Sequence, residues 1–108
     1  MIVKKLILVL ATTLMVACSS QVQQGSISLA YSNFEDRDYE DTLKYINQAE
    51  KVRSTTPEMH AELTYLKAQT FQKMGRYDEE EALYRYLVEQ HPRSQYGYMA
   101  KEQLAKKM

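Results

Sequence analysis

The sequence contains few of the residues that build cross-linked or sheet-rich folds. Its 108 residues include one cysteine, two prolines and three glycines. A single cysteine excludes an intramolecular disulfide and a metal site built from several cysteines. No Asn-Gly or Asp-Gly pair occurs, and apolar and polar residues do not alternate over any sustained stretch, so β-hairpins are not expected. We therefore expect an all-α fold.

An excess of charge of one sign is also missing. The 14 lysine and arginine residues balance 14 aspartate and glutamate residues, and no long block of one sign occurs. Proteins that bind nucleic acid normally carry a basic stripe. We therefore expect no nucleic-acid partner.

The sequence has no recognisable catalytic or metal-binding motif. His60 and His91 stand far apart in the sequence, on different predicted elements, and neither belongs to an H-E-x-x-H pattern. The acidic run 79–81 opens a predicted helix, where negative charge is favourable without any chemistry. Gly75 and Gly97 belong to no phosphate-binding loop. We expect no enzymatic activity, no metal and no cofactor other than covalent lipid.

What the sequence does contain is a distinctive N-terminus. Lys4 and Lys5 precede an apolar stretch over residues 6–17, which is shorter than the roughly 20 residues needed to span a bilayer. This pattern predicts an export signal peptide. Ordinary signal cleavage favours small residues at positions −3 and −1, and Ala17 fits the second position while Met15 fits the first badly.

The residues Met15-Val16-Ala17-Cys18 resemble the lipobox of bacterial lipoproteins. The resemblance implies removal of residues 1–17, diacylglycerol on the Cys18 sulfur and acylation of the new amino group, and several acyl chains give stable anchoring. By the same resemblance, Ser19 after the cysteine implies sorting to the outer membrane, facing the periplasm, rather than to the inner membrane. A free thiol or an intermolecular disulfide is the alternative, but neither explains why Cys18 directly follows the apolar run.

The remaining chain divides into two predicted parts. Residues 18–25 are expected to form the lipidated cysteine and a short polar tether, and residues 26–108 one helical domain within about 30 Å of the bilayer. Its five predicted helices are roughly 10 to 18 residues long. The predicted starts are Asp38 before Tyr39, the run Thr55-Thr56-Pro57-Glu58, and Asp78 with Glu81. The predicted ends lie near Arg53-Ser54, Met74-Gly75 and His91-Pro92, and a last helix from about 94 to 107 is expected to carry Tyr98, Ala100, Leu104 and Ala105 on one stripe.

Residues 61–94 span 34 positions, which is the period of the tetratricopeptide repeat (TPR). The matching landmarks are Ala68 as the small residue, Phe71 as the aromatic, Gly75-Arg76-Tyr77-Asp78-Glu79 as the turn, Tyr84 and Leu87 in the second helix, and Pro92 at the end. The segment therefore resembles a TPR unit. Glu80 departs from the pattern, because a small alanine is usual there.

An earlier unit resembles the same pattern. Its landmarks are Leu29-Ala30 as the close-approach pair, Phe34 as the aromatic, Asp38-Tyr39-Glu40-Asp41 as the turn, and Thr42, Tyr45, Ile46 and Ala49 in the second helix. The spacing from Tyr39 to Tyr77 exceeds the TPR period, so a short insertion is expected near residues 54–57. The helix after Arg93 is expected to cap the array. The resemblance thus implies a short array of antiparallel helix pairs, with about two repeats and a C-terminal capping helix.

The TPR resemblance also implies where a partner binds. The first helices of stacked repeats form a concave face, and the residues mapped onto it are Tyr31, Phe34, Glu35, Glu62, Tyr65, Gln69, Gln72 and Lys73. Tyrosine is enriched in the cores of protein interfaces. We expect this face to bind another envelope protein or a peptide segment.

The expected function is that of a membrane-anchored, non-enzymatic adaptor or assembly factor in the bacterial cell envelope. Such an adaptor would work within a secretion, pilus, polysaccharide-export or cell-wall machine. Two alternatives remain open. The chain can instead form a homo-oligomeric scaffold through unfinished repeat ends, because short arrays lack full stability alone, or it can act as a soluble periplasmic binding module if Cys18 is not lipidated.

Overall fold

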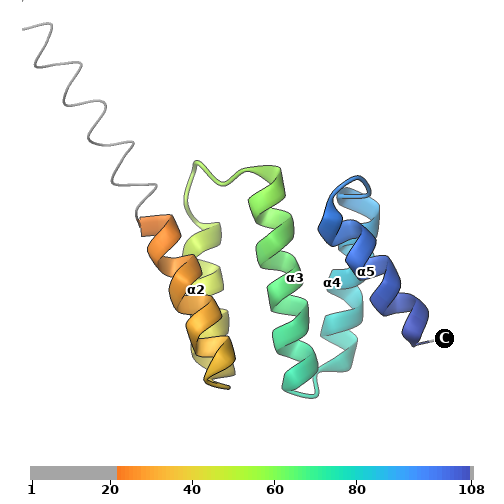
Figure 1. Ribbon diagram of the computed structural model, residues 1–108, viewed down its shortest axis with the longest axis horizontal. Helices are drawn as coiled ribbons and strands as arrows, with labels where there is room; N and C mark the ends of the chain where they lie inside the picture. Colours follow the sequence, from red (N-terminus) through yellow and green to blue (C-terminus); the bar gives the residue numbers. More distant parts are fainter. Residues whose placement is uncertain (1–21, 108) are drawn as a thin grey trace, which may run out of the picture.

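The computed structural model describes residues 22–107, and every regular element in that range is a helix (Figure 1). The first described helix covers residues 22–35 and is called helix 22–35. Four labelled helices follow: α2 Tyr39–Glu50, α3 Pro57–Lys73, α4 Tyr77–Gln90 and α5 Gln95–Lys106. The predicted all-α fold is confirmed. The predicted signal peptide 1–17 and Cys18 lie outside the described residues.

Successive helices run in opposite directions and lie side by side (Figure 1). Helix 22–35, α3 and α5 lie toward the viewer, with α2 and α4 behind them. α3 is the central element, since it contacts α2, α4 and α5. The result is a two-layered array of antiparallel helix pairs. Among residues 22–107, no helix combines the length and the apolar character that crossing a bilayer requires.

Local signals place the ends of α3. The Thr56 side chain accepts a hydrogen bond from the Met59 backbone N–H at 3.1 Å, and Pro57 occupies the first turn, where its missing N–H costs nothing. At the other end Gly75 adopts a left-handed φ of 75°. The Arg76 N–H then donates to the Phe71 carbonyl at 2.8 Å, which closes a Schellman motif. Both predicted boundaries of α3 are confirmed.

The same turn occurs earlier in the chain, after helix 22–35. Arg37 has a φ of 64°, and the Asp38 N–H donates to the Asn33 carbonyl at 2.8 Å. Asn33 is thus the equivalent of Phe71. Phe34, which the TPR resemblance placed at the aromatic position, lies one position after it. The two helix pairs are structural repeats, and Arg37 and Gly75 mark the equivalent point in each.

Buried positions repeat with the same spacing as these two turns. The equivalent buried pairs are Gln23 and Ala61, Ser26 and Thr64, Ala30 and Ala68, Thr42 and Glu80, Ile46 and Tyr84, and Ala49 and Leu87. Most of these side chains are apolar or small, which lets the helices approach closely. The repeat is therefore present in the packing as well as in the turns.

α3 has two buried faces. Leu63 and Leu66 pack with Ala30 and Ile46 in one apolar cluster, while Tyr65 belongs to the second cluster with residues of α4 and α5. A helix that is buried on two sides carries apolar residues around most of its circumference. α3 is therefore the element that joins the two halves of the core.

Two expected helix ends differ from the structure. α4 begins at Tyr77 with Arg76 as its N-cap, so Asp78 lies inside the first turn and does not cap the helix. α2 ends at Glu50, ahead of the expected Arg53. The expected last helix is confirmed, because α5 begins directly after Ser94, whose side chain caps it by accepting from the Tyr96 N–H.

The apolar stripe of α5 also differs from the expectation. Gly97 and Ala100 are buried, while Tyr98 is 62% exposed and Ala105 is exposed. Gly97 is required at its position, because an added Cβ would lie 2.0 Å from the His91 carbonyl oxygen. α5 thus approaches the end of α4 along a face of small residues.

The N-terminal boundary of the helical domain lies earlier than expected. Residues 22–25, which the composition assigned to a polar tether, are helical, and Gln23 is only 4% exposed. The Gln23 Nε2 donates to Thr55 Oγ1 at 2.7 Å and to the Ala49 carbonyl at 3.3 Å. This amide holds the start of helix 22–35 against the loop that follows α2.

Candidate binding surface

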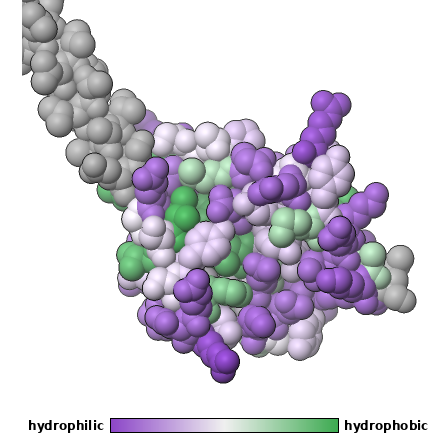
Figure 2. Space-filling model, in the orientation of Figure 1, coloured by the Kyte–Doolittle hydropathy of each residue, from purple (hydrophilic) through white to green (hydrophobic). Residues whose placement is uncertain are grey.

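Helix 22–35, α3 and α5 together form one surface, called the front face, which is the side shown in Figures 1 and 2. Figure 2 shows apolar and weakly hydrophilic residues toward its middle and strongly hydrophilic residues toward its right and lower edges. The residues expected to bind a partner belong to helix 22–35 and α3.

Tyr31 and Glu62 form a contact across the front face. The Tyr31 Oη donates to Glu62 Oε1 at 2.8 Å, and Tyr31 is 36% exposed. Partial burial raises the pKa of the Tyr31 phenol far above its ordinary value, and the hydrogen bond to Glu62 and the charge of that carboxylate raise it further. The phenol is therefore a stable donor that links helix 22–35 to α3.

Tyr65 and Phe34 lie deeper than the sequence suggested. Tyr65 is only 6% exposed, and its ring lies between those of Tyr84 and Tyr96, with centroid distances of 5.7 Å and 5.8 Å. Burial raises the pKa of Tyr65. Phe34 is half-buried and meets the Tyr39 ring edge-on at 5.8 Å. Both rings serve the core, so Tyr31 is the exposed aromatic side chain among the mapped residues.

The remaining mapped residues are polar. Gln69 is half-buried, and Gln72 and Lys73 are exposed at the C-terminal end of α3. Glu35 is exposed at the end of helix 22–35. Besides Tyr31, the mapped residues therefore offer carboxylates, amides and one cation. Such groups can bond the backbone and side chains of a partner segment.

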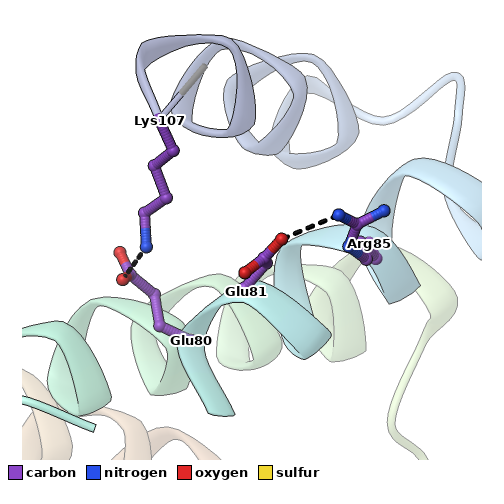
Figure 3. Close-up of polar contacts among 4 residues, drawn as sticks. All are labelled: Glu80, Glu81, Arg85 and Lys107. Atoms are coloured by element: carbon purple, nitrogen blue, oxygen red, sulfur yellow. Dashed lines mark hydrogen bonds and ion pairs between the residues drawn. The ribbon is translucent and has the colours of Figure 1, made fainter. Parts of the chain in front are cut away.

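α5 is held to α4 by a buried charge. Lys107, directly after α5, extends its Nζ to the Glu80 carboxylate, as Figure 3 shows. The Glu80 side chain is fully buried, while that of Lys107 is 33% exposed. The second Glu80 oxygen and the Tyr84 hydroxyl have no hydrogen-bond partner among the described residues. Burial raises the pKa of Tyr84, and the nearby Tyr65 phenol and Glu80 carboxylate add to the rise.

Figure 3 also shows a surface pair on α4. Arg85 donates to Glu81 at 2.7 Å, and this hydrogen bond holds the pKa of Glu81 below its ordinary value. The Arg85 side chain is largely exposed and that of Glu81 is partly exposed. Pairs of this kind contribute little to stability, because water and salt screen them. Of the two ion pairs in Figure 3, the Glu80–Lys107 pair is the one with a buried member.

A cluster that spacing along the chain did not reveal joins both histidines of the sequence. His60 Nε2 lies 3.1 Å from Tyr86 Oη, and the His91 ring lies 5.8 Å from both other rings, measured between centroids. The cluster borders a depression of about 450 Å³ that Glu50 and Gln90 also line. The cluster could have been predicted from the antiparallel pairing of α3 and α4, because that pairing places the start of α3 beside the end of α4.

Within residues 22–107, no three or more histidine, cysteine, aspartate or glutamate side chains gather into a group able to hold a metal ion. Comparisons of the chain with protein-family models, with curated proteins and with solved structures found no match. The described residues form a helical array whose front face carries Tyr31 and polar side chains, with a histidine–tyrosine cluster at one end.

Proposed function

We propose that the protein is a lipid-anchored, non-enzymatic adaptor or assembly factor of the bacterial cell envelope, which binds a partner protein through its front face. The observation that carries the proposal is the repeated helix pair, since stacking of the two units places their first helices side by side. The TPR-like landmarks and the lipobox-like residues before Cys18 support the same function.

The start of helix 22–35 bears on how an anchored protein would be oriented. Only three residues, 19–21, separate Cys18 from residue 22. At about 3.5 Å per residue, the helix would begin within roughly 15 Å of a lipid attached to Cys18. Figure 1 places the loops 51–56 and 91–94 at this same end of the array. The proposal therefore has that end facing the bilayer, with the front face accessible from the side.

The front face suits a peptide segment better than a small molecule. Tyr31 provides aromatic contact area, and the amides of Gln69 and Gln72 can bond a peptide backbone. Glu62 and Lys73 add charges of opposite sign, which would select the register of a bound segment. We therefore assign the partner to the class of envelope proteins that present an extended or helical segment.

Labelling and cross-linking in cells test the proposal. The full-length chain would be produced with its signal in a Gram-negative host that is fed a palmitate analogue, beside a Cys18→Ala variant. A photo-cross-linking residue would replace Gln72 on the front face or, as a matched control, the exposed Glu89 on α4. We expect lipid label that depends on Cys18 and a discrete cross-linked product from position 72 alone.

Each part of the proposal can fail separately. An unlabelled product that stays in the soluble periplasm overturns the anchor and favours a soluble binding module. Equal products from positions 72 and 89, or none, overturn the front face as the binding surface. A product with twice the mass of the chain indicates self-association and favours the scaffold alternative.

A further inference from the structure

We propose that His60, Tyr86 and His91 bind one divalent late transition-metal ion, with Zn²⁺ and Cu²⁺ as the ions of suitable chemistry. The chain has two histidines, and the fold brings both to one place although they belong to opposite ends of the second helix pair in the sequence. The site uses none of the residues mapped to partner binding, so this proposal does not depend on the adaptor function.

The His60 and Tyr86 side chains hold two donor atoms at a separation that suits one metal ion. His60 Nε2 and Tyr86 Oη are 3.1 Å apart. Two donors that each lie about 2.0 to 2.1 Å from a zinc ion are separated by about 2.9 Å at a right angle and about 3.4 Å at the tetrahedral angle. The observed separation falls between these limits. One ion could therefore take both donors without a large movement of either side chain.

The position of the His91 ring also suits one shared ion. The centroids of the His60 and His91 rings are 5.8 Å apart. When an imidazole nitrogen lies about 2.0 Å from a metal ion, the ring centroid lies about 3.2 Å from that ion. The centroids of two such rings are about 5.2 Å apart in tetrahedral geometry and at most about 6.4 Å apart when the rings lie on opposite sides of the ion. The observed distance lies within this range. The ring spacing is thus compatible with both histidines binding one ion.

The fold holds the backbone of both histidines in place. His60 lies in the first turn of α3, and its N–H donates to the Thr56 carbonyl at 2.9 Å. The His91 N–H donates to the Leu87 carbonyl at 2.9 Å, and its own carbonyl accepts from the Ser94 N–H at 3.2 Å. Gly97 packs directly against that carbonyl. Ligands on a fixed backbone bind with little loss of conformational freedom.

The surroundings leave room for a complete coordination shell. The depression of about 450 Å³ beside the three rings is lined by the carboxyl-bearing Glu50 and the amide-bearing Gln90. Water can therefore reach a fourth position. Imidazole nitrogen with one phenol oxygen suits Zn²⁺ and Cu²⁺, whereas Mg²⁺ and Ca²⁺ prefer oxygen ligands. Binding would require neutral histidines and would release the Tyr86 proton if the phenolate binds, so it would weaken as the pH falls.

Titration of the full chain tests the site. The protein would be prepared in detergent without an affinity tag and with Cys18→Ser, so that no thiol competes for the metal. Calorimetry with Zn²⁺ should show one ion per chain. His60→Gln and His91→Gln should each weaken binding at least about tenfold, because loss of even an outer-shell partner costs that much. Tyr86→Phe should also weaken it, and the matched control Tyr98→Phe, at an exposed tyrosine of α5, should not.

Electron paramagnetic resonance with Cu²⁺ gives a readout that does not depend on the variants folding. We expect hyperfine splitting from two imidazole nitrogens in the chain with both histidines, and far-UV circular dichroism would confirm that each variant stays helical. A Cu²⁺ signal without two nitrogens overturns the proposal. So does Zn²⁺ binding that is unmeasurable or is unchanged in His91→Gln, in which case the three rings are an aromatic packing cluster only.

Discussion

Thr42 and Glu80 occupy the same position in the two helix pairs, and both are fully buried. The Thr42 hydroxyl is satisfied locally, because it donates to the Asp38 carbonyl at 2.8 Å. Glu80 instead depends on Lys107, which follows α5, and its second oxygen has no partner among the described residues. The second pair therefore needs the capping helix to neutralise a charge that the first pair does not contain.

Lys107→Ala should destabilise the protein. It removes the cation from a fully buried carboxylate, and we expect a loss of about 2 kcal/mol in the free energy of unfolding. The value is below that for wholly buried pairs, because the Lys107 side chain is 33% exposed. Urea unfolding measures it, with the exposed neighbour Lys106→Ala as control. Equal stabilities of the two variants would contradict the prediction.

Glu80→Thr should remove the dependence on Lys107. The substitution copies the residue found at position 42, whose hydroxyl can bond the preceding turn of its own helix. We expect no loss of stability, and in this background Lys107→Ala should cost less than about 0.5 kcal/mol. A double-mutant cycle measures the coupling. If Lys107→Ala costs the same in both backgrounds, the ion pair is not the source of its effect.

The turns at Arg37 and Gly75 should respond in opposite ways to substitution. Both residues have a positive φ, which costs a residue with a Cβ roughly 1 kcal/mol. Arg37→Gly should therefore stabilise the protein by up to about 1 kcal/mol, and Gly75→Ala should destabilise it by about 1 kcal/mol, with no steric clash because nothing lies within 4 Å of an added Cβ. Thermal unfolding would show shifts of opposite sign; shifts of the same sign would be inconsistent with equivalent turns.

Gly97→Ala should be more damaging than either turn substitution. The new Cβ would lie 2.0 Å from the His91 carbonyl oxygen, so α5 or the end of α4 must move. We expect a loss of about 2 to 3 kcal/mol in urea unfolding. Gly25→Ala is the matched control, since Gly25 is helical with nothing within 4 Å, and there alanine should stabilise by up to about 1 kcal/mol. A small effect at Gly97 would refute the close approach.

Alkaline pH should destabilise the fold through its tyrosines. The pKa values of Tyr31, Tyr65 and Tyr84 are raised above the ordinary 10.0 in the folded state. Above about pH 10 the unfolded chain loses these phenol protons before the folded protein does, so the free energy of unfolding should fall as the pH rises. Below about pH 10 both states keep the protons, and these groups should not make the free energy of unfolding depend on pH. Urea midpoints between about pH 8 and pH 11 measure it. Tyr84→Phe should reduce the alkaline slope; an unchanged slope would exclude Tyr84 as a contributor.

The amino-acid sequence alone determined the features that depend on residues within one or two helical turns. Thr56 and Pro57 mark the start of α3, and Gly75 marks its end, because capping and a positive φ are local requirements. The expected start at Asp38-Tyr39 likewise matched α2, which begins at Tyr39. The helical class and its repeat could therefore be predicted.

Only the tertiary structure decided which side chains meet and which are exposed. Tyr65 and Gln23 are buried because helices distant in sequence cover them, and Glu80 is neutralised by a lysine that follows the last helix. His60 and His91 meet because an antiparallel pair brings the start of one helix to the end of the next. These contacts cannot be predicted from hydrophobic periodicity, since burial depends on how the helices rotate and stack against one another.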